Sequence, residues 1–298
     1  MSRLQTRHSR RAQPPEASRK VFTIREKQQL APNIWRMKVL APKIAQKRKA
    51  GQFVILRVDE TGERFPLTIA DSDPAAGTIT IVFQVAGRST TILGALEPGQ
   101  DILDLVGPLG QPTHVEKVGH VVCIGGGVGI APVYPIICAM KAAGNRVTSI
   151  ISARSKDLLI LEEDMRSHSD ELKIATDDGS YGIKGFPTQI LQAMMDAKEK
   201  IDLVVAVGPV PMMRAICQVT KPAGLKTMVS LNPIMVDGTG MCGGCRVSVA
   251  GKTRFVCVDG PEFDGHEVDF DLLAKRLRTY TDMEKQSLQA HVCKATNG

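Results

Sequence analysis

Three cysteines and one aspartate near the C-terminal end of the chain have a spacing that is typical of an iron–sulfur loop. Asp237 is followed by four residues and Cys242, then by two residues and Cys245, then by eleven residues and Cys257. Plant-type [2Fe–2S] loops have the spacing Cys-x4-Cys-x2-Cys with a distant fourth cysteine, so aspartate occupies the first ligand position here. Glycines fill the gaps, and glycine lets the backbone approach a cluster closely. The pattern favours a [2Fe–2S] cluster.

Zinc is the alternative occupant of this loop, because Cys-x2-Cys is also a zinc spacing. Zinc loops usually pair two such motifs or add histidines, whereas this chain offers one motif, a third cysteine and an aspartate. The cluster is therefore favoured over zinc. His266 follows in a turn-rich segment, where a hydrogen-bonded turn histidine is more common than a ligand. A non-redox zinc-binding interaction module on a degenerate nucleotide fold is the corresponding functional alternative.

The N-terminal part of the chain has the pattern of a small antiparallel β-barrel. Short alternating segments at 34–40, 53–58 and 78–85 are separated by glycine and proline turns. Two stretches within it could bind a ligand. One is 64–71, and the other is 87–93, where a glycine and three hydroxyls precede an apolar run. A helix start of that kind suits a pyrophosphate, although an ordinary capped helix has the same pattern.

From His120 onward the pattern changes to alternating strands and helices. A buried strand at 121–124 runs into a glycine turn and then a helix, which is the first unit of a nucleotide-binding α/β domain. The strict G-x-G-x-x-G fingerprint is not met, because Ile130 occupies the third glycine position. Further strands are expected at 147–152, 172–176 and 201–207, with a helix at 159–167. Open α/β sheets bind ligands at the carboxyl ends of strands.

The remaining segments complete the predicted organisation. A hairpin at 246–257 is expected to bring Cys257 back to the loop, and a single terminal helix is expected at 270–289. The predicted domains are a disordered basic tail (1–19), a β-barrel (20–115), a nucleotide-binding α/β domain (116–226), a [2Fe–2S] subdomain (227–270) and a C-terminal helix and tail (271–298); the resemblance given below implies FAD for the barrel and NAD(P) for the α/β domain.

Charge and cysteine usage exclude several classes of protein. The formal net charge is +7, but six basic residues against one acidic residue in the first twenty positions account for most of it. The basic charge is thus not a patch on a folded face, which disfavours nucleic-acid binding. No apolar run approaches the ~18–20 residues of a membrane span. The seven cysteines show no disulfide framework. We expect a cytoplasmic protein without nucleic-acid or membrane partners.

The order of these motifs resembles the ferredoxin–NADP reductase superfamily. The stretches that carry the resemblance are 64–71, the glycine turn at 125–132, Thr-Asp-Asp-Gly-Ser-Tyr-Gly at 176–182, Gly-Pro-x-x-Met-Met at 208–213 and the cluster loop. Within the superfamily, the chain is similar to the small (alpha) subunits of NADH-dependent reduced ferredoxin:NADP oxidoreductases, also described as sulfide dehydrogenase β-type subunits. The related subunit of dihydroorotate dehydrogenase has cysteine where this chain has Asp237, which argues against dihydroorotate chemistry.

The resemblance implies a set of cofactor-binding residues. For FAD it implies Arg64, Pro66, Leu67, Thr68, Gly87, Ser89 and Thr90, and for the nicotinamide dinucleotide it implies Gly125, Gly127, Gly129, Asp178 and Gly208. Arg64 stands one place earlier than in the Arg-x-x-Ser/Thr pattern of other reductases. The cluster ligands would be Asp237, Cys242, Cys245 and Cys257. The expected dinucleotide is NAD(H) rather than NADP(H).

The implied activity is electron transfer. Hydride would pass between NAD(H) and FAD, and single electrons would pass through the [2Fe–2S] cluster. The resemblance implies a larger flavoprotein and iron–sulfur subunit that carries the NADP site and communicates with ferredoxin, with electron bifurcation as one form of the reaction. The alternative is an electron-transfer subunit for a dihydroorotate or a sulfide/polysulfide dehydrogenase.

Overall fold

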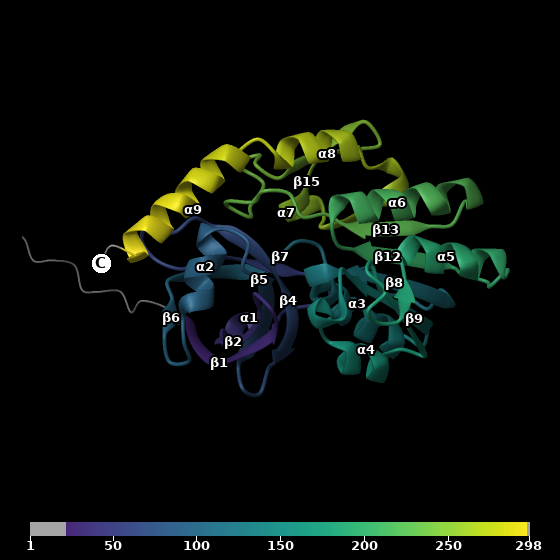
Figure 1. The fold of residues 1–298 in the computed structure, drawn as a ribbon, viewed down its shortest axis with the longest axis horizontal. Helices are drawn as coiled ribbons and strands as arrows, with labels where there is room; N and C mark the ends of the chain where they lie inside the picture. The colour runs from purple at the N-terminus through teal and green to yellow at the C-terminus, as the bar shows by residue number, and fades with distance from the viewer. Residues whose placement is uncertain (1–21, 297–298) are drawn as a thin grey trace, which may run out of the picture.

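The computed structural model describes residues 22–296, which form a barrel, an α/β unit and a C-terminal part lying across both (Figure 1). The basic segment 1–19 lies outside the described residues. The barrel and the α/β unit confirm the predicted fold class. Among the described helices, none has the length and apolar character needed to cross a bilayer.

The barrel is one antiparallel sheet with the strand order β6-β1-β2-β5-β4-β3-β7. Its strands are β1 (Phe22–Ala31), β2 (Ile34–Leu40), β3 (Phe53–Arg57), β4 (Phe65–Asp73), β5 (Thr78–Gln84), β6 (Asp101–Ile102) and β7 (Asp104–Leu109), and its helices are α1 (Pro42–Ala45) and α2 (Arg88–Ala95). Alternate residues point inward, so that Met37, Ile69 and Ile81 are fully buried in a common core. This alternation leaves the opposite face of β3 and β4 free to bind other parts of the chain.

The α/β unit contains a second sheet, with the order β11-β10-β9-β8-β12-β13-β16. Its strands are β8 (His120–Gly126), β9 (Arg146–Ala153), β10 (Glu171–Thr176), β11 (Ile183–Lys184), β12 (Leu203–Val207), β13 (Thr227–Ser230) and β16 (Glu262–Asp264). Its helices are α3 (Ile130–Ala142), α4 (Glu162–His168), α5 (Pro187–Asp196) and α6 (Val210–Thr220), with short 3-10 turns at Gly127–Gly129, Lys156–Leu158, Lys221–Ala223 and Gly265–Glu267. Helix α4 begins three residues later than predicted, because Leu161 adopts a left-handed backbone with φ 56°.

The second sheet continues past residue 227, where the sequence places the start of the iron–sulfur subdomain. Strand β13 pairs in parallel with β12, and β16 pairs antiparallel with β13. The chain therefore leaves the sheet after β13, forms the cluster loop, and returns to the same sheet at β16. The cluster loop and the nucleotide sheet share one hydrophobic core.

The C-terminal part consists of β14 (Arg246–Val249), β15 (Lys252–Phe255), α7 (Val256–Asp259), α8 (Phe270–Leu277) and α9 (Thr281–Thr296). Strands β14 and β15 form the predicted hairpin, which is confirmed by their antiparallel pairing. The prediction of a single helix at 270–289 is wrong, because a turn at 278–280 separates α8 from α9. Helix α9 extends away from the α/β unit and reaches α2 of the barrel (Figure 1).

Candidate functional site

A cleft of about 760 Å³ lies where the barrel, the nucleotide sheet and the start of the cluster loop meet. The barrel contributes Pro66 and Thr68 from β4, and the glycine turn after β8 contributes Gly127 and Gly129. Met235 lines the same cleft from the segment that leads into the cluster loop. One cavity is thus bordered by the 64–71 stretch, the glycine turn and the segment that leads into the cluster loop, whereas 87–93 lies outside its lining.

The alternation of β4 decides which of its predicted residues can face a ligand. Pro66 and Thr68 line the cleft, whereas the side chain of Leu67, between them, packs against the barrel core. Successive side chains of a strand point to opposite faces. Leu67 can therefore meet a ligand in this cleft only through its backbone.

The glycine turn uses its glycines for two different purposes. A Cβ atom on Gly129 would lie 2.5 Å from the Val207 carbonyl oxygen, and one on Gly125 would lie 2.8 Å from the Ile130 Cα. These two glycines let α3 start close to β8 and β12. Gly127 has φ 56°, and a Cβ atom there would meet no heavy atom within 4 Å, so its backbone is open to the cleft. Gly126, which was not among the predicted residues, also lines the cleft.

The predicted polar residues at the strand ends separate into cleft-lining and turn-forming residues. Gly208 lines the cleft at the end of β12, and Asp177 lines it at the end of β10. Asp178 lies outside the lining. Its Oδ1 accepts hydrogen bonds from the hydroxyl and the backbone N–H of Ser180 at 2.7 and 2.9 Å, and these bonds hold the pKa of Asp178 below its ordinary value. The sequence signal that could have identified Asp177 is its position, because it is the first residue after strand β10.

Three arginines lie near the end of the barrel where a pyrophosphate was predicted. Arg64 forms an ion pair with Asp104, and Arg57 is the cross-strand partner of Asp104. Arg88, the first residue of α2, approaches the Thr61 hydroxyl at 3.5 Å. The Nε of Arg57 is buried without a hydrogen-bond partner among the described residues. Arg57 and Arg88 were missed because no motif marks them.

Helix α2, whose start was predicted to bind a pyrophosphate, is capped by the side chain of its own residue Thr90. Thr90 Oγ1 accepts hydrogen bonds from the backbone N–H groups of Ala86 and Gly87 at 3.0 and 3.1 Å. The Thr90 hydroxyl is therefore engaged in the helix start. No heavy atom lies within 4 Å of a Cβ position on Gly87, so the backbone there is accessible to a ligand. Ser89, in the first turn of the same helix, is partly exposed.

The four predicted cluster ligands form two pairs. The sulfur atoms of Cys245 and Cys257 lie 3.3 Å apart, and both residues are buried. Asp237 accepts hydrogen bonds through its two carboxylate oxygens from the backbone N–H groups of Thr239 and Cys242, at 2.9 and 2.8 Å. These bonds hold the pKa of Asp237 below its ordinary value. Burial raises the pKa of Cys257 to about 12, so cluster insertion there would release a proton.

The donor set of this loop, three thiols and one carboxylate with plant-type spacing, fits a [2Fe–2S] cluster. Among the side chains that the structure describes, no group of three or more His, Cys, Asp or Glu is placed to hold a metal ion. Gly238 lies so close to the barrel that a Cβ atom there would be 2.6 Å from Leu109 Cδ1 and 3.0 Å from Ile55 Cδ1. The loop therefore packs directly on β3 and β7.

Comparisons with known proteins agree with both halves of this site. Residues 123–218 match the oxidoreductase NAD-binding domain, and residues 232–269 match the iron–sulfur cluster binding domain of dihydroorotate dehydrogenase B. A dihydroorotate dehydrogenase B (NAD(+)) electron transfer subunit homolog from Thermotoga maritima is 46% identical over 264 residues, covering 89% of this chain and 93% of the relative. The chain belongs to this family of electron transfer subunits.

Further relatives extend the likeness. A probable dihydroorotate dehydrogenase B electron transfer subunit from Methanopyrus kandleri is 33% identical, over 77% of this chain and 84% of the relative. A chain from the solved structure of an NADH-dependent reduced ferredoxin-NADP oxidoreductase superposes with a TM-score of 0.88 at 42% identity, covering 93% of this subunit and 99% of that chain. The electron transfer subunit thus has the expected fold, an NAD-binding domain and an iron–sulfur domain.

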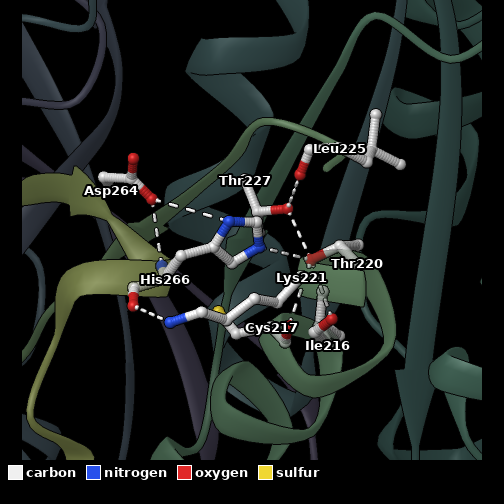
Figure 2. Close-up of polar contacts among 8 residues, drawn as sticks. All are labelled: Ile216, Cys217, Thr220, Lys221, Leu225, Thr227, Asp264 and His266. Carbon is white, nitrogen blue, oxygen red and sulfur yellow. Dashed lines mark hydrogen bonds and ion pairs between the residues drawn. The ribbon is translucent and has the colours of Figure 1, made fainter. Parts of the chain in front are cut away.

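His266 is not part of the cluster site (Figure 2). Its Nε2 lies 2.9 Å from the Thr220 hydroxyl, and Lys221 donates to its backbone carbonyl at 2.9 Å. Thr227 donates to Thr220 in the same network. His266 therefore connects the end of α6 to the turn after β16 through hydrogen bonds. This agrees with the interpretation from the sequence that it is a hydrogen-bonded turn histidine.

Proposed function

We propose that this electron transfer subunit accepts hydride from NADH on an FAD bound at the cleft and passes single electrons to a [2Fe–2S] cluster held by Asp237, Cys242, Cys245 and Cys257. A flavin supplies the coupling between two-electron and one-electron chemistry. Pro66 and Thr68 form the face against which the flavin would lie. Gly127 leaves room for the dinucleotide, and Gly208 lines the same cleft with its own close approach to Met212.

One adjacency supports this electron path most directly. Ile55 on β3 and Pro66 on β4 are cross-strand partners, so their side chains lie on the same face of the barrel sheet. Pro66 lines the cleft, and Ile55 contacts the cluster loop at Gly238. The flavin face and the cluster loop are therefore neighbours on one surface, which is the arrangement that electron transfer between them needs.

The dinucleotide is proposed to be NAD(H). An NADP 2′-phosphate needs a cation, and Arg154 is an exposed cation in the cleft lining. Lys156 lies over the Tyr181 ring at 5.1 Å. Glu162 accepts a hydrogen bond from the Tyr181 hydroxyl at 3.0 Å and forms an ion pair with Arg166 at 2.7 Å. Neither Lys156 nor Glu162 lines the cleft. The proposal of NAD(H) therefore rests on the related electron transfer subunits, which are named for NAD(+).

Electrons would leave the chain at the tip of the cluster loop. Met241 is 88% exposed and Val236 is 46% exposed, while Cys242 is also at the surface. The homologues are electron transfer subunits, which implies a larger partner subunit. We propose that this partner carries the NADP site, docks over Met241 and Val236, and exchanges electrons with ferredoxin.

An anaerobic titration of the purified chain, first with NADH and then separately with NADPH, tests the proposal. We expect NADH to bleach a flavin band and then the broader iron–sulfur absorption, with a weaker response to NADPH. A protein without a chromophore, or with a flavin that neither nucleotide reduces, would contradict it. A colourless protein containing zinc would support the interaction module instead.

A dihydroorotate dehydrogenase is the second candidate partner, because the iron–sulfur domain match and the curated relatives carry that name. Asp237 in place of cysteine argues for the ferredoxin:NADP reaction. Mixing the reduced chain with each type of partner and following cluster reoxidation distinguishes the two. Faster reoxidation by a dihydroorotate-oxidising subunit would favour the second candidate.

A further inference from the structure

Arg276 on α8 contacts the cluster loop from outside the ligand set. Its Nη2 donates a hydrogen bond to the Gly244 carbonyl oxygen at 3.0 Å, although the two residues are 32 positions apart. Gly244 lies between Cys242 and Cys245, and its backbone N–H points at the Cys242 sulfur at 3.5 Å. The guanidinium is thus attached to the turn that connects two of the proposed ligands.

The positive charge of Arg276 has no acidic counterpart. Its side chain is partly buried, no carboxylate forms an ion pair with it among residues 22–296, and its Nε is buried without a hydrogen-bond partner there. Nearby, Arg214 on α6 does form an ion pair with Asp271 of α8, at 2.6 Å. Holding a cation away from water is costly unless an anion compensates it. A negative charge close to Gly244 would therefore stabilise the Arg276 guanidinium in this position.

A [2Fe–2S] cluster with three thiolates and one carboxylate would supply that charge. Such a cluster is negatively charged when oxidised and gains one more negative charge on reduction. A fixed cation beside it consequently stabilises the reduced form more than the oxidised form. Net charge and hydrogen bonding around the cluster are among the main controls on its reduction potential.

Helix α8 is fixed in place by contacts at its start and along its buried face. Asp269 caps the helix by accepting a hydrogen bond from the Leu272 N–H at 2.9 Å, and the Asp269 N–H donates to the Ser248 carbonyl on β14 at 3.0 Å. Leu273 is buried in the core shared with Cys245 and Cys257. The helix is therefore anchored to the hairpin that carries the loop, which keeps Arg276 in place.

We propose that Arg276 is a positioning residue that holds the Cys242–Cys245 turn and raises the reduction potential of the cluster. This inference rests on the proposed function, because it requires the cluster. The variants are Arg276→Gln, which removes the charge, and Arg276→Lys, which keeps the charge without the planar guanidinium. Arg278→Gln is the matched control, because Arg278 belongs to the same C-terminal segment and is exposed.

The experiment is a redox titration of the full chain monitored by EPR, with iron content measured on the same samples. We expect Arg276→Gln to retain iron but to show about a tenfold lower ratio of reduced to oxidised cluster at a fixed ambient potential, equivalent to about 59 mV for a one-electron couple. Arg276→Lys should titrate between Arg276→Gln and the wild type, and Arg278→Gln should match the wild type.

A wild-type midpoint potential in Arg276→Gln would overturn the inference. If Arg276→Gln fails to hold iron, Arg276→Lys decides: a retained cluster with a potential near that of the wild type supports the role of the charge, and loss of iron there as well overturns it. These failures are distinct from failure of the proposed function, in which the wild-type chain itself would hold no cluster.

Discussion

The sulfur atoms of Cys245 and Cys257 lie 3.3 Å apart across twelve positions of sequence. The hairpin of β14 and β15 accounts for this approach, because Arg246, which follows Cys245, is the cross-strand partner of Phe255, which lies two residues before Cys257. Asp237 and Cys242 form the other pair through a backbone hydrogen bond. The loop thus holds two of the proposed ligands in the buried core and the other two nearer the surface.

Replacing a buried ligand should remove the cluster. We expect Cys257→Ala to lose most of its iron and its iron–sulfur absorption, because alanine has no donor atom and the buried position leaves no room for a substitute ligand from solvent. Cys138→Ala is the matched control, since Cys138 lies on α3 outside the loop. Iron content and visible spectra of the two variants check this, and full iron content in Cys257→Ala would contradict the ligand assignment.

Replacing Asp237, the proposed carboxylate ligand, should retain the cluster. Asp237→Cys supplies the fourth thiolate of a plant-type loop, so we expect iron content to stay the same while the midpoint potential moves to lower values, because ligand identity is a main control on the potential. EPR spectra and redox titration of this variant provide the measurement. An unchanged spectrum together with an unchanged potential would mean that Asp237 is not a ligand.

Two glycines of the nucleotide turn should respond differently to alanine. Gly129→Ala places a methyl group 2.5 Å from the Val207 carbonyl oxygen, and we expect a loss of about 1–3 kcal/mol in the free energy of unfolding. Gly127→Ala meets no protein atom but has a left-handed backbone, which costs about 1–2 kcal/mol, and its methyl group enters the cleft.

The measurement is denaturant unfolding together with the KM for NADH in flavin reduction. Gly127→Ala should raise KM more than its stability loss explains, and the variant should remain fully folded at assay temperature. An unchanged KM in Gly127→Ala would show that the dinucleotide does not approach this turn.

Glu262 should make stability fall as pH rises. Burial raises the pKa of Glu262 above its ordinary 4.5, against the opposing hydrogen bond from the Thr113 hydroxyl at 2.5 Å. The folded chain therefore holds the Glu262 proton more tightly than the unfolded chain does. Its contribution to stability is complete below 4.5 and is lost as pH rises through the folded-state pKa.

Glu262→Gln should flatten that dependence, because glutamine remains neutral. Thermal unfolding from about pH 4 to about pH 8 compares the wild type, Glu262→Gln and Glu267→Gln, the last being an exposed control. We expect the Tm difference between Glu262→Gln and the wild type to grow with pH. Parallel profiles for all three proteins would contradict the raised pKa.

The spacing of residues in the sequence predicted those parts of the candidate site that one continuous backbone segment forms. The cluster loop and the glycine turn are continuous segments, so their residue types follow from short-range needs such as positive φ and close approach. Asp177 and Asp178 are adjacent in sequence and chemically alike, and only the end of β10 and the bonds of Ser180 distinguish them. Arg276 reaches Gly244 across 32 positions, and no pattern in the sequence marks that contact.

The break between α8 and α9 also escaped prediction, since neither glycine nor proline occurs at 278–280. Thr279 and Thr281 flank Tyr280 there, and β-branched and aromatic residues lose side-chain freedom in a helix. Thr281 and Asp282 then favour a new helix start. The apolar periodicity of 270–289 predicted one continuous helix. It outweighed two weaker signals, namely the poor helix formers at 279–281 and the helix start at Thr281.

Strand β16 has a mechanical consequence. The backbone hydrogen bonds of the second sheet run from β8, which ends in the glycine turn, through β12 and β13 to β16, and Cys257 precedes β16 by five residues. The glycine turn and the buried cysteine pair are therefore attached to the same sheet, on either side of β12. Moving one of them away from the other would break the backbone hydrogen bonds that β12 makes with β8 and β13, so the sheet limits their relative displacement.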